Sequence, residues 1–406
     1  MKTIKIFSAI IIFASITYSQ PGWIDWNYSG GTNLSAGHFN DMNTGWAAGQ
    51  FGTIIKTTDN CHTWVQQSTT ISTWLNSVYF IGNKGWAVGT VGTILYTTNG
   101  GTNWLGSAPY SYSLFDVDFV NESIGFTAGL NGYILKTETG GTSWLTGGNI
   151  SPVVDLFSIE FTNPYTGWVS GQGGKIFKTT NGGINWVQQS TPVVNLLDEI
   201  YAVNDLYLFC SGDNGTVLKT TNGGTNWVQT NTGVTQWLHS VNFINVLTGW
   251  SCGDEGVIIK TTNGGINWVR QESYTANSLA GIFFYSSIYG WAVGTGGRVL
   301  RTTNGGEPIG IQQISHEIPV QFSILQNYPN PFNPVTSIEF TVPKKAFISL
   351  RIFNSIGKEI DVLVNKNLLP GTYRYEWNAS SYPSGIYFYT LQSENFAETK
   401  KMILIK

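Results

Sequence analysis

WAVGTVGTILYTTNGGTNW, residues 86–104, is one of seven copies of a single pattern in this chain. The copies begin at residues 46, 86, 126, 168, 209, 250 and 291, so successive starts lie 40, 40, 42, 41, 41 and 41 residues apart. Most copies join two apolar runs through a glycine-containing turn and reach a closing Trp after an Asn-Gly turn. Self-similarity at a period of about 40 residues indicates a repeat architecture built from one supersecondary unit.

Each repeat predicts four short strands. The first is an alternating run, and the second and third flank a Gly-x-x-Gly turn. The fourth begins near the closing Trp. The alternating runs include Leu75–Phe80, Leu114–Phe119, Leu156–Phe161 and Leu238–Phe243. Asn-Gly between two apolar runs is a strong hairpin signal. Four antiparallel strands in about 40 residues correspond to a propeller blade, so we expect an all-β protein whose residues 20–306 form a seven-bladed β-propeller.

The ends of the repeat region predict how the ring closes. Six copies end in a fourth-strand Trp, but the seventh does not. At the other end of the region, Trp23 lies 16 residues before Phe39, the interval that also separates Trp64 from Phe80. We therefore expect Trp23–Tyr28 to form the outer strand of the last blade, beside the third strand of the seventh copy. This arrangement leaves no open sheet edge.

The turn before the closing Trp resembles the Asp-box of sialidases and related propellers, a Ser/Thr-x-Asp-x-Gly-x-x-Trp hairpin. Residues 97–104 read TTNGGTNW, the first copy carries Asp59 at the acid position, and the third carries Thr139. The other copies carry Asn99, Asn181, Asn222, Asn263 and Asn304. The resemblance implies a structural turn, and Asx side chains do hydrogen-bond their own backbone in turns.

The whole repeat is similar to that of the photosystem II assembly-factor-like propellers, which carry BNR-type repeats. The similarity rests on the Gly-Trp-x-x-Gly piece that opens most copies and covers residues 23–306. It implies the propeller fold. It would also suggest an arginine-rich binding face, but Arg270, Arg298 and Arg301 are the only arginines in this region.

The first 19 residues predict a secretory signal peptide. Lys2 and Lys5 precede an apolar run over residues 6–16, and the small residues Thr17 and Ser19 place cleavage before Gln20. An uncleaved anchor is the alternative, but the run is far shorter than the ~20 residues that a membrane span requires. We therefore expect export and no transmembrane segment after cleavage.

Composition excludes several partners and cofactors. Only 11% of the residues are charged and the net charge is −3, so no basic footprint for nucleic acid exists. Cys61, Cys210 and Cys252 are an odd, sparse set that predicts no disulfide framework. The four histidines do not occur at metal-ligand spacing, and no nucleotide-binding fingerprint is present. We expect neither a metal nor another cofactor.

After residue 306 the pattern changes. Residues 307–321 contain two prolines and no repeat, and predict a linker. Residues 322–406 contain apolar segments bounded by Gly, Pro or Asn, which predict a small immunoglobulin-like β-sandwich. Pro329, Pro331 and Pro334 cannot donate to a sheet ladder, so their segment should run along an edge.

Several motifs in this tail together resemble the type A sorting domain of the type IX secretion system. They are FSILQNYPNPFNP at 322–334, IFNSIGKE at 352–359, PGTY at 370–373, SGIY at 384–387 and ETKKMILIK at 398–406. The resemblance implies recognition by the outer-membrane translocon, followed by removal of the tail or surface attachment. An ordinary immunoglobulin-like domain without an export role is the alternative. The implied sorting signal comprises Tyr328, Pro329, Asn330, Pro331, Phe332, Gly357, Gly385, Lys400 and Lys401.

Two functional hypotheses remain open for the propeller. In the first it is a polysaccharide hydrolase, because propellers active on xyloglucan use similar repeats with paired acids. Asp213 and Asp254 occupy the same second-to-third-strand turn in adjacent repeats, with Glu255 beside the latter. An Asp in a tight glycine turn also has a simple backbone explanation. A sialidase would need an arginine cluster for its carboxylate substrate, which this chain lacks.

In the second hypothesis the propeller is a binding or scaffold module for a glycan or protein ligand. Function on a rigid scaffold usually lies in its loops, and aromatic side chains form common platforms for sugars and protein hot spots. The connections between blades carry Trp74, Tyr110, Tyr112, Trp237 and Tyr274. These rings could equally pack over the blade tops. We expect the ligand to dock on this face, with Asp254, Glu255 and Arg298 nearby.

Overall fold

The computed structural model describes residues 22–26, 28–107, 111–148, 150–306, 311–315, 317–379 and 382–405. The predicted signal peptide and Tyr110 lie outside these ranges. The chain divides into two compact units, one spanning residues 21–307 and the other including residues 308–406, and each is described by itself. In the described ranges, no helix has the length and apolar character needed to cross a bilayer.

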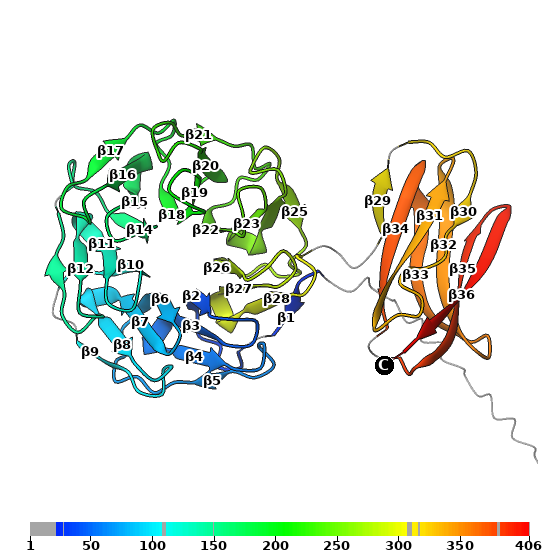
Figure 1. Ribbon diagram of the computed structural model, residues 1–406, viewed down its shortest axis with the longest axis horizontal. Helices are drawn as coiled ribbons and strands as arrows, with labels where there is room; N and C mark the ends of the chain where they lie inside the picture. Colours follow the sequence, from blue (N-terminus) through cyan, green and yellow to red (C-terminus); the bar gives the residue numbers. More distant parts are fainter. Residues whose placement is uncertain are drawn as a thin grey trace, which may run out of the picture. The chain divides into compact units, whose positions relative to one another are not determined.

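The first unit is the predicted propeller. Seven four-stranded antiparallel sheets surround a central channel, with first strands such as β2 and β6 facing the centre and fourth strands such as β5 and β9 at the circumference (Figure 1). The first strands are β2 (Leu34–Phe39), β6 (Leu75–Ile81), β10 (Leu114–Phe119), β14 (Leu156–Phe161), β18 (Leu197–Ala202), β22 (Leu238–Phe243) and β26 (Leu279–Phe284). The second strands are β3 (Gly45–Gly49), β7 (Lys84–Gly89), β11 (Gly125–Gly129), β15 (Gly167–Gly171), β19 (Leu208–Gly212), β23 (Gly249–Gly253) and β27 (Gly290–Gly294).

The outer half of each blade is shorter. The third strands are β4 (Ile54–Thr57), β8 (Ile94–Thr97), β12 (Ile134–Thr137), β16 (Lys175–Thr179), β20 (Thr216–Thr220), β24 (Ile258–Thr261) and β28 (Val299–Thr302). The fourth strands are β5 (Val65–Gln66), β9 (Leu105–Ser107), β13 (Leu145–Thr146), β17 (Val187–Gln189), β21 (Val228–Gln229), β25 (Val269–Gln271) and β1 (Ile24–Asp25). Blades are numbered 1 to 7 from β2 to β26.

The N-terminal strand closes the ring, as the sequence predicts. β1 pairs with β28, with Ile24 opposite Arg301, and the Trp26 and Tyr28 amides continue the pairing. Trp23 is buried and meets Phe284 edge-on at 5.6 Å between ring centroids. The closing Trp of other blades makes the same contact, as Trp104 does with Phe80 at 5.7 Å.

An aromatic stack joins most neighbouring blades. In these blades the aromatic residue near the start of the second strand lies flat on the Phe near the end of the next blade's first strand, with centroids 3.6 Å apart for Trp46 and Phe80. The Trp46 indole also donates to the Gly100 carbonyl of that next blade. The ammonium of Lys56 donates to the same carbonyl and sits 5.1 Å from the Trp46 ring. Stacking, a hydrogen bond and a cation–π contact therefore meet at one interface.

Six of the seven interfaces carry this stack. The pairs are Trp46–Phe80, Trp86–Phe119, Phe126–Phe161, Phe209–Phe243, Trp250–Phe284 and Trp291–Phe39. In each receiving blade the Phe ring also covers a glycine that opens the second strand, and a Cβ on Gly85 would lie 2.2 Å from Phe80.

Blade 5 exchanges the large and small residues of this pair. Ala202 stands where the other first strands have the Phe. Leu208, which lies opposite Ala202, stands where the other second strands have the glycine. Leu208 is fully buried and belongs to the apolar cluster around Trp168. The pair thus fills the interface from the second strand instead of the first.

The second unit is a sandwich of two antiparallel four-stranded sheets. Their order is β29-β34-β31-β30 and β33-β32-β35-β36, and residues such as Phe340, Ile352 and Tyr389 are buried between them. The strands are β29 (Ile311–Ser315), β30 (Ser323–Ile324), β31 (Val335–Val342), β32 (Ala346–Asn354), β33 (Glu359–Leu368), β34 (Gly371–Asn378), β35 (Gly385–Ser393) and β36 (Phe396–Leu404).

The predicted linker 307–321 needs a correction. Ile311–Ser315 forms strand β29, which pairs with β34 from Ile311 opposite Tyr375 to Ser315 opposite Thr372. Only four residues separate the end of the repeats at residue 306 from this strand, so the segment is mostly part of the sandwich. An isolated run of this kind has no hairpin partner nearby in sequence, which is why local patterns did not reveal it.

The exchanged pair in blade 5 gives a prediction for stability. Leu208→Gly should lower the free energy of unfolding by roughly 3 kcal/mol through a cavity, and Ala202→Phe by about 1–3 kcal/mol through overpacking. The double variant restores the arrangement of the other blades and should recover at least ~1 kcal/mol of the summed loss. Denaturant unfolding of the four proteins measures this coupling.

The control combines Ala202→Phe with Leu197→Ala, because Leu197 is equally buried at the other end of β18. This combination should show no recovery. Strictly additive losses for the Ala202–Leu208 pair would contradict the account.

Candidate functional site

A β-bulge in each first strand decides which side chains face the channel. In all seven first strands the register shifts after the opening Leu, as between Leu197 and Glu199 in β18. A bulge turns two consecutive residues toward the same side of the sheet. Asp198 and Glu199 therefore both line the channel, whereas plain alternation would separate them.

The channel encloses a cavity of about 530 Å³, within the range of small-ligand pockets. We call the face that carries the entries into the first strands and the turns between second and third strands the upper face, and the opposite one the lower face. From upper to lower face the first strands contribute three layers. The layers are Ser35, Asn76, Phe115, Phe157, Asp198, His239 and Ala280; then Ala36, Ser77, Asp116, Ser158, Glu199, Ser240 and Gly281; then His38, Tyr79, Asp118, Glu160, Tyr201, Asn242 and Phe283.

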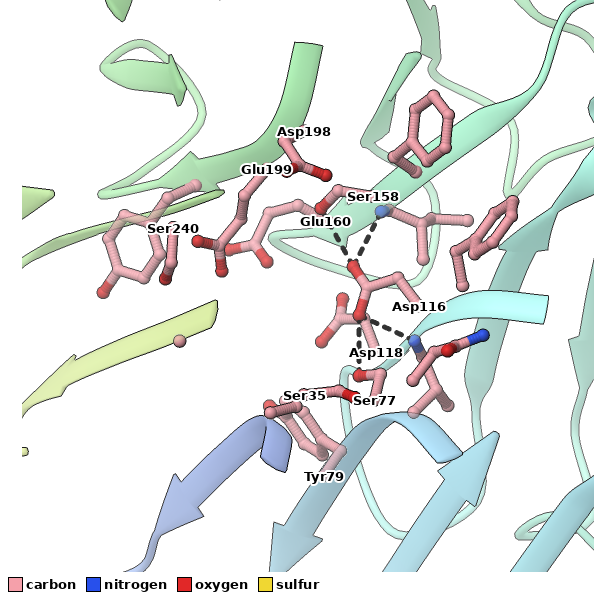
Figure 2. A pocket seen from close by; sticks show the side chains of 18 of the residues that line it. Ser35, Ser77, Tyr79, Asp116, Asp118, Ser158, Glu160, Asp198, Glu199 and Ser240 are labelled. Atoms are coloured by element: carbon pink, nitrogen blue, oxygen red, sulfur yellow. Dashed lines mark hydrogen bonds between the residues drawn. The ribbon is translucent and has the colours of Figure 1, made fainter. Parts of the chain in front are cut away.

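Five carboxyl groups gather on one side of this channel. They are Asp116, Asp118, Glu160, Asp198 and Glu199, all from blades 3 to 5. In Figure 2 the side chains of Asp118, Glu160 and Glu199 point into the same space. None of these five residues was among the candidates predicted from the sequence. Their signal was present as alternating acids in β10, paired acids in β18 and a single acid in β14, but the bulge hides that signal from a simple period of two.

These carboxyl groups also bridge neighbouring blades. Asp116 accepts from the Ser77 hydroxyl at 2.8 Å on one side and from the Ser158 hydroxyl at 2.9 Å on the other (Figure 2). Glu199 accepts from the Val241 amide at 2.6 Å. Asp118 likewise accepts from the Phe161 amide at 2.7 Å. First strands of adjacent blades do not pair as a sheet, so these acceptors satisfy amides that would otherwise be orphaned.

Burial raises the pKa values of three of these carboxyl groups, those of Asp118, Glu160 and Glu199. It raises the pKa of Asp118 to about 7, with the nearby charge of Asp116 acting in the same direction. It raises the pKa of Glu199 to about 8, against the hydrogen bonds from Ser240 and Val241. The pKa of Glu160 is also well above its ordinary value, because of burial and then the charge of Asp118. The channel therefore holds protons at neutral pH.

On the upper face, four of the predicted binding residues lie in or beside a hydrogen-bonded network centred on His239 and Asp254 in blades 6 and 7. His239 lies 5.0 Å from the Trp237 ring and bonds Asp198 at 2.8 Å and Asp254 at 3.0 Å. Ser278 donates to Asp254 at 2.7 Å. The neighbouring Asn277 accepts from Arg298, and Gln236 donates to Glu255 at 2.9 Å. Arg298 is also ion-paired with Asp25.

The charges of this network support each other. Burial alone would lower the pKa of His239, but its bonds to Asp198 and Asp254 outweigh burial and raise it. Burial opposes ionisation of Asp254, but the hydrogen bonds from Ser278 and His239 lower its pKa. A glycosidase acid requires the opposite shift. Asp213 accepts from the neighbouring Asn214 amide at 2.6 Å, which is the backbone role expected for a tight turn.

The other predicted aromatics lie elsewhere on the upper face. Trp74 donates its indole N–H to Ser35, and Tyr112 lies 5.2 Å from Tyr133, in blades 1 to 3. Tyr274 is exposed in the connection that enters blade 7. The structure thus brings Trp237, Asp254, Glu255 and Arg298 together but places Trp74 and Tyr112 in a separate part of the face.

No metal centre is evident. In the ranges that the structure describes, no three His, Cys, Asp or Glu side chains converge in a way that could hold a metal ion. Cys61, Cys210 and Cys252 are all buried, and burial raises the pKa of the Cys61 thiol to about 12. Thiols in such surroundings are unreactive.

In the sandwich, the predicted sorting segment lies along the edge of the last strand. Phe332 is buried against Trp377, and its backbone bonds Ile403 and Ile405 beside β36. The side chain of Asn330 accepts from the Ile403 amide and donates to the Lys401 carbonyl. The edge position expected from the prolines is therefore observed. Of the remaining residues, Tyr328 is 81% exposed, Gly357 lies in the β32–β33 turn with φ of 76°, Gly385 opens β35, and Lys400 pairs with Glu398.

Together these features define a seven-bladed β-propeller with an acid-rich channel, joined to a β-sandwich tail. Two family models match the chain. The model described as photosynthesis system II assembly factor YCF48 matches residues 22–108 and 106–227, half of the sequence, so the chain belongs to this family of propellers. The model of the secretion system C-terminal sorting domain matches residues 326–406, which indicates handling by the type IX secretion system.

Solved structures confirm the propeller fold. The chain is similar to a structure titled "YCF48 bound to D1 peptide", with 19% identity, a TM-score of 0.60, and coverage of 70% of this chain and 95% of that one. YCF48 from Cyanidioschyzon merolae gives 18% identity, a TM-score of 0.59, and coverage of 69% and 98%. The WD40 propeller of Doa1 gives 11% identity, a TM-score of 0.53, and coverage of 66% and 92%. No curated protein matches the sequence.

The channel acids predict that stability falls as pH rises. Carboxyl groups of the unfolded chain titrate near pH 4, whereas Asp118 and Glu199 hold their protons in the folded state to about 7 and 8. The folded state therefore binds more protons between these values, and raising the pH favours unfolding. The unfolding temperature should be roughly 5 °C or more higher at pH 5 than at pH 8.5.

Glu199→Gln should flatten this dependence, because an amide oxygen can still accept from Val241 but does not titrate. The matched control is Glu255→Gln, an exposed acid whose replacement should leave the slope unchanged. An unfolding temperature that rises between pH 5 and pH 8.5, or an unchanged slope in Glu199→Gln, would overturn this interpretation.

Proposed function

We propose that this protein is an exported binding or scaffold module that acts at the cell surface or in the medium, with its ligand site on the upper face of the propeller. The observation that carries the proposal is the network of Trp237, His239 and Asp254 beside the mouth of the channel. A half-exposed ring next to fixed polar groups is a common arrangement for ligand recognition. The ligand classes we consider are a glycan and a protein.

The surrounding structure supports a site on this face. Asp254 is held by His239 and Ser278, and Arg298 is held by Asn277 and Asp25. Such pre-organised side chains lose little freedom on binding. Trp74, Tyr112 and Glu255 extend the same face. A propeller with the same fold has been seen with a bound peptide, which is consistent with a polypeptide ligand here.

We also propose how the chain is delivered. Residues 1–19 act as a signal peptide that is removed before Gln20, and residues 322–406 present the sorting signal to the type IX translocon. The segment 328–332 and the strand that carries Lys400 and Lys401 lie side by side, so the elements of the sorting signal that are separated in sequence form one surface. Asp213 and Asp254 are assigned backbone and network roles, and no hydrolytic activity is proposed.

Binding is tested with a glycan array and with pull-downs from the extracellular protein fraction, using the mature chain 20–406. At least one probe that the wild-type chain retains should be weakened about 10-fold or more in Trp237→Ala, because buried aromatic anchors dominate binding energy. The matched control is Tyr165→Ala, which removes an exposed ring from a hairpin of the lower face. An equal loss of binding in both variants would refute the site, and so would the failure of the wild-type chain to bind any probe.

Export is tested with a reporter protein fused to residues 307–406, which include β29 and β30. In a host with a type IX system, the reporter should reach the surface or the medium. In the same host without the translocon, it should stay in the periplasm. A reporter that remains periplasmic in the competent host would contradict the assignment.

A further inference from the structure

The upper face is divided into two halves that differ in charge, because the acidic side chains gather in the second half, where exposed apolar residues such as Val194 also occur. The first half, which we call the apolar arc, comprises Phe51, Trp74, Val91 and Tyr112, with exposed fractions of 70%, 40%, 56% and 43%. These residues belong to blades 1 to 3, and hydrogen bonds at two of them link neighbouring blades. Trp74 donates to Ser35 of blade 1, and the Val91 amide donates to Ser113 of blade 3.

Phe51 and Val91 occupy an unusual position for apolar residues. Each stands at the tip of the turn between second and third strands, with φ of 57°. At the same position blades 3 and 5 have Asn131 and Asn214, and blades 4 and 7 have glycine. An aromatic or β-branched residue is strained in this left-handed conformation. Neither exposure to water nor backbone geometry favours Phe51 and Val91 here, so a role in contact with a partner accounts for them.

The second half, which we call the acidic arc, comprises Asp155, Asp198, Asp213, Asp254 and Glu255 in blades 4 to 6. Their hydrogen-bond donors are neutral groups or histidine. Asp155 accepts from the Asn131 amide and Glu255 from Gln236, for example. Over the described ranges, none of these carboxylates forms an ion pair with Lys or Arg. Two acids of the lower face differ, since Glu122 pairs with Lys84 at 2.9 Å and Glu138 pairs with Lys136 at 2.8 Å.

The basic residues of the propeller lie mostly on the opposite side. Third-strand lysines such as Lys178 and Lys219 donate to carbonyls in the turns of the lower face, at Gly223 and Gly264. The upper face carries Lys175 and Arg298, and the latter is already paired with Asp25. His239 and Lys175 compensate the acidic arc only in part, so it keeps a net negative charge whose field extends toward whatever approaches this face.

We propose that the upper face binds a cationic amphipathic polypeptide segment, whose apolar side chains cover the apolar arc while its Lys or Arg side chains face the acidic arc. This inference rests on the proposed function and specifies the chemistry of its ligand. Nucleic acids and acidic glycans would meet repulsion from the acidic arc. A neutral glycan would gain no electrostatic attraction from the carboxylates of the acidic arc. A basic segment with apolar residues matches both halves at once.

The test uses two synthetic peptides with the same Leu and Trp pattern, one with Lys and one with Glu at every polar position. Fluorescence anisotropy with the mature chain 20–406 should show binding of the Lys peptide that weakens several-fold from 50 to 300 mM salt, because surface charges are screened. The Glu peptide should bind at least about 50-fold more weakly, as expected for like charges.

Two pairs of substitutions probe the two arcs. Phe51→Asn with Val91→Asn introduces the residue that blades 3 and 5 already use, so the turns remain compatible with folding. Asp213→Asn with Glu255→Gln removes two charges but keeps the acceptor oxygens. Each pair should weaken the Lys peptide about 5-fold or more. The control pair Asp205→Asn with Leu206→Asn changes the lower face and should have no effect.

The possible outcomes are distinct. Equal binding of both peptides, or equal losses from upper-face and lower-face pairs, would overturn the proposal. If chitosan oligosaccharides bind through the same residues and the Lys peptide does not, the polypeptide assignment is wrong while the upper-face site stands. If neither probe binds and the glycan array and the pull-down are also blank, both this inference and the proposed function are wrong.

Discussion

The propeller depends on the flat stack of an aromatic ring from one blade on the terminal Phe of the next blade's first strand. At the interface of blades 1 and 2, this stack brings together the Trp46 ring, the Lys56 ammonium and the Gly100 carbonyl. No blade can complete that contact alone. The ring is therefore stabilised as a cycle of interfaces, and its last interface depends on a strand from the far end of the repeat region.

The channel carboxyl groups are a consequence of this cyclic arrangement. First strands splay apart around the axis, so their amides need acceptors from the neighbouring blade. Serine or asparagine fills this role in blade 6, where Ser240 accepts from Ile282 and Asn242 from Phe284. In blades 3 to 5 acids take the same positions. The carboxyl groups satisfy structural hydrogen bonds, but their clustering also makes the channel acidic and proton-binding, which a serine ring would not do.

Much of the fold could be predicted from the sequence, because the repeat spacing, the Asn-Gly turns and the position of Trp23 are all local signals. The set of side chains that line the channel could not be predicted in this way. The bulge after each opening Leu changes which side of the strand the next residues face, and alternation alone misplaces Asp116 and Glu199. Likewise β29 has no local partner, and the exchange of Ala202 and Leu208 becomes meaningful only when the two strands are seen in register. Of the predicted upper-face residues, Trp237, Asp254, Glu255 and Arg298 lie near one another around His239, and their role in binding remains a prediction. The division of that face into apolar and acidic halves required the ring arrangement of the blades.

Ring closure is the central claim, and it is tested most directly by comparing a chain of residues 20–406 with a chain that begins at residue 29 and lacks Trp23 and β1. The intact propeller should unfold in a single transition in which Trp fluorescence and far-UV circular dichroism coincide. The shortened chain should lose roughly 3 kcal/mol or more of its free energy of unfolding, and amides of β26 to β28 should exchange first, because the last blade loses its outer strand and a buried Trp. Equal unfolding midpoints and equal amide protection in the two chains would contradict the account.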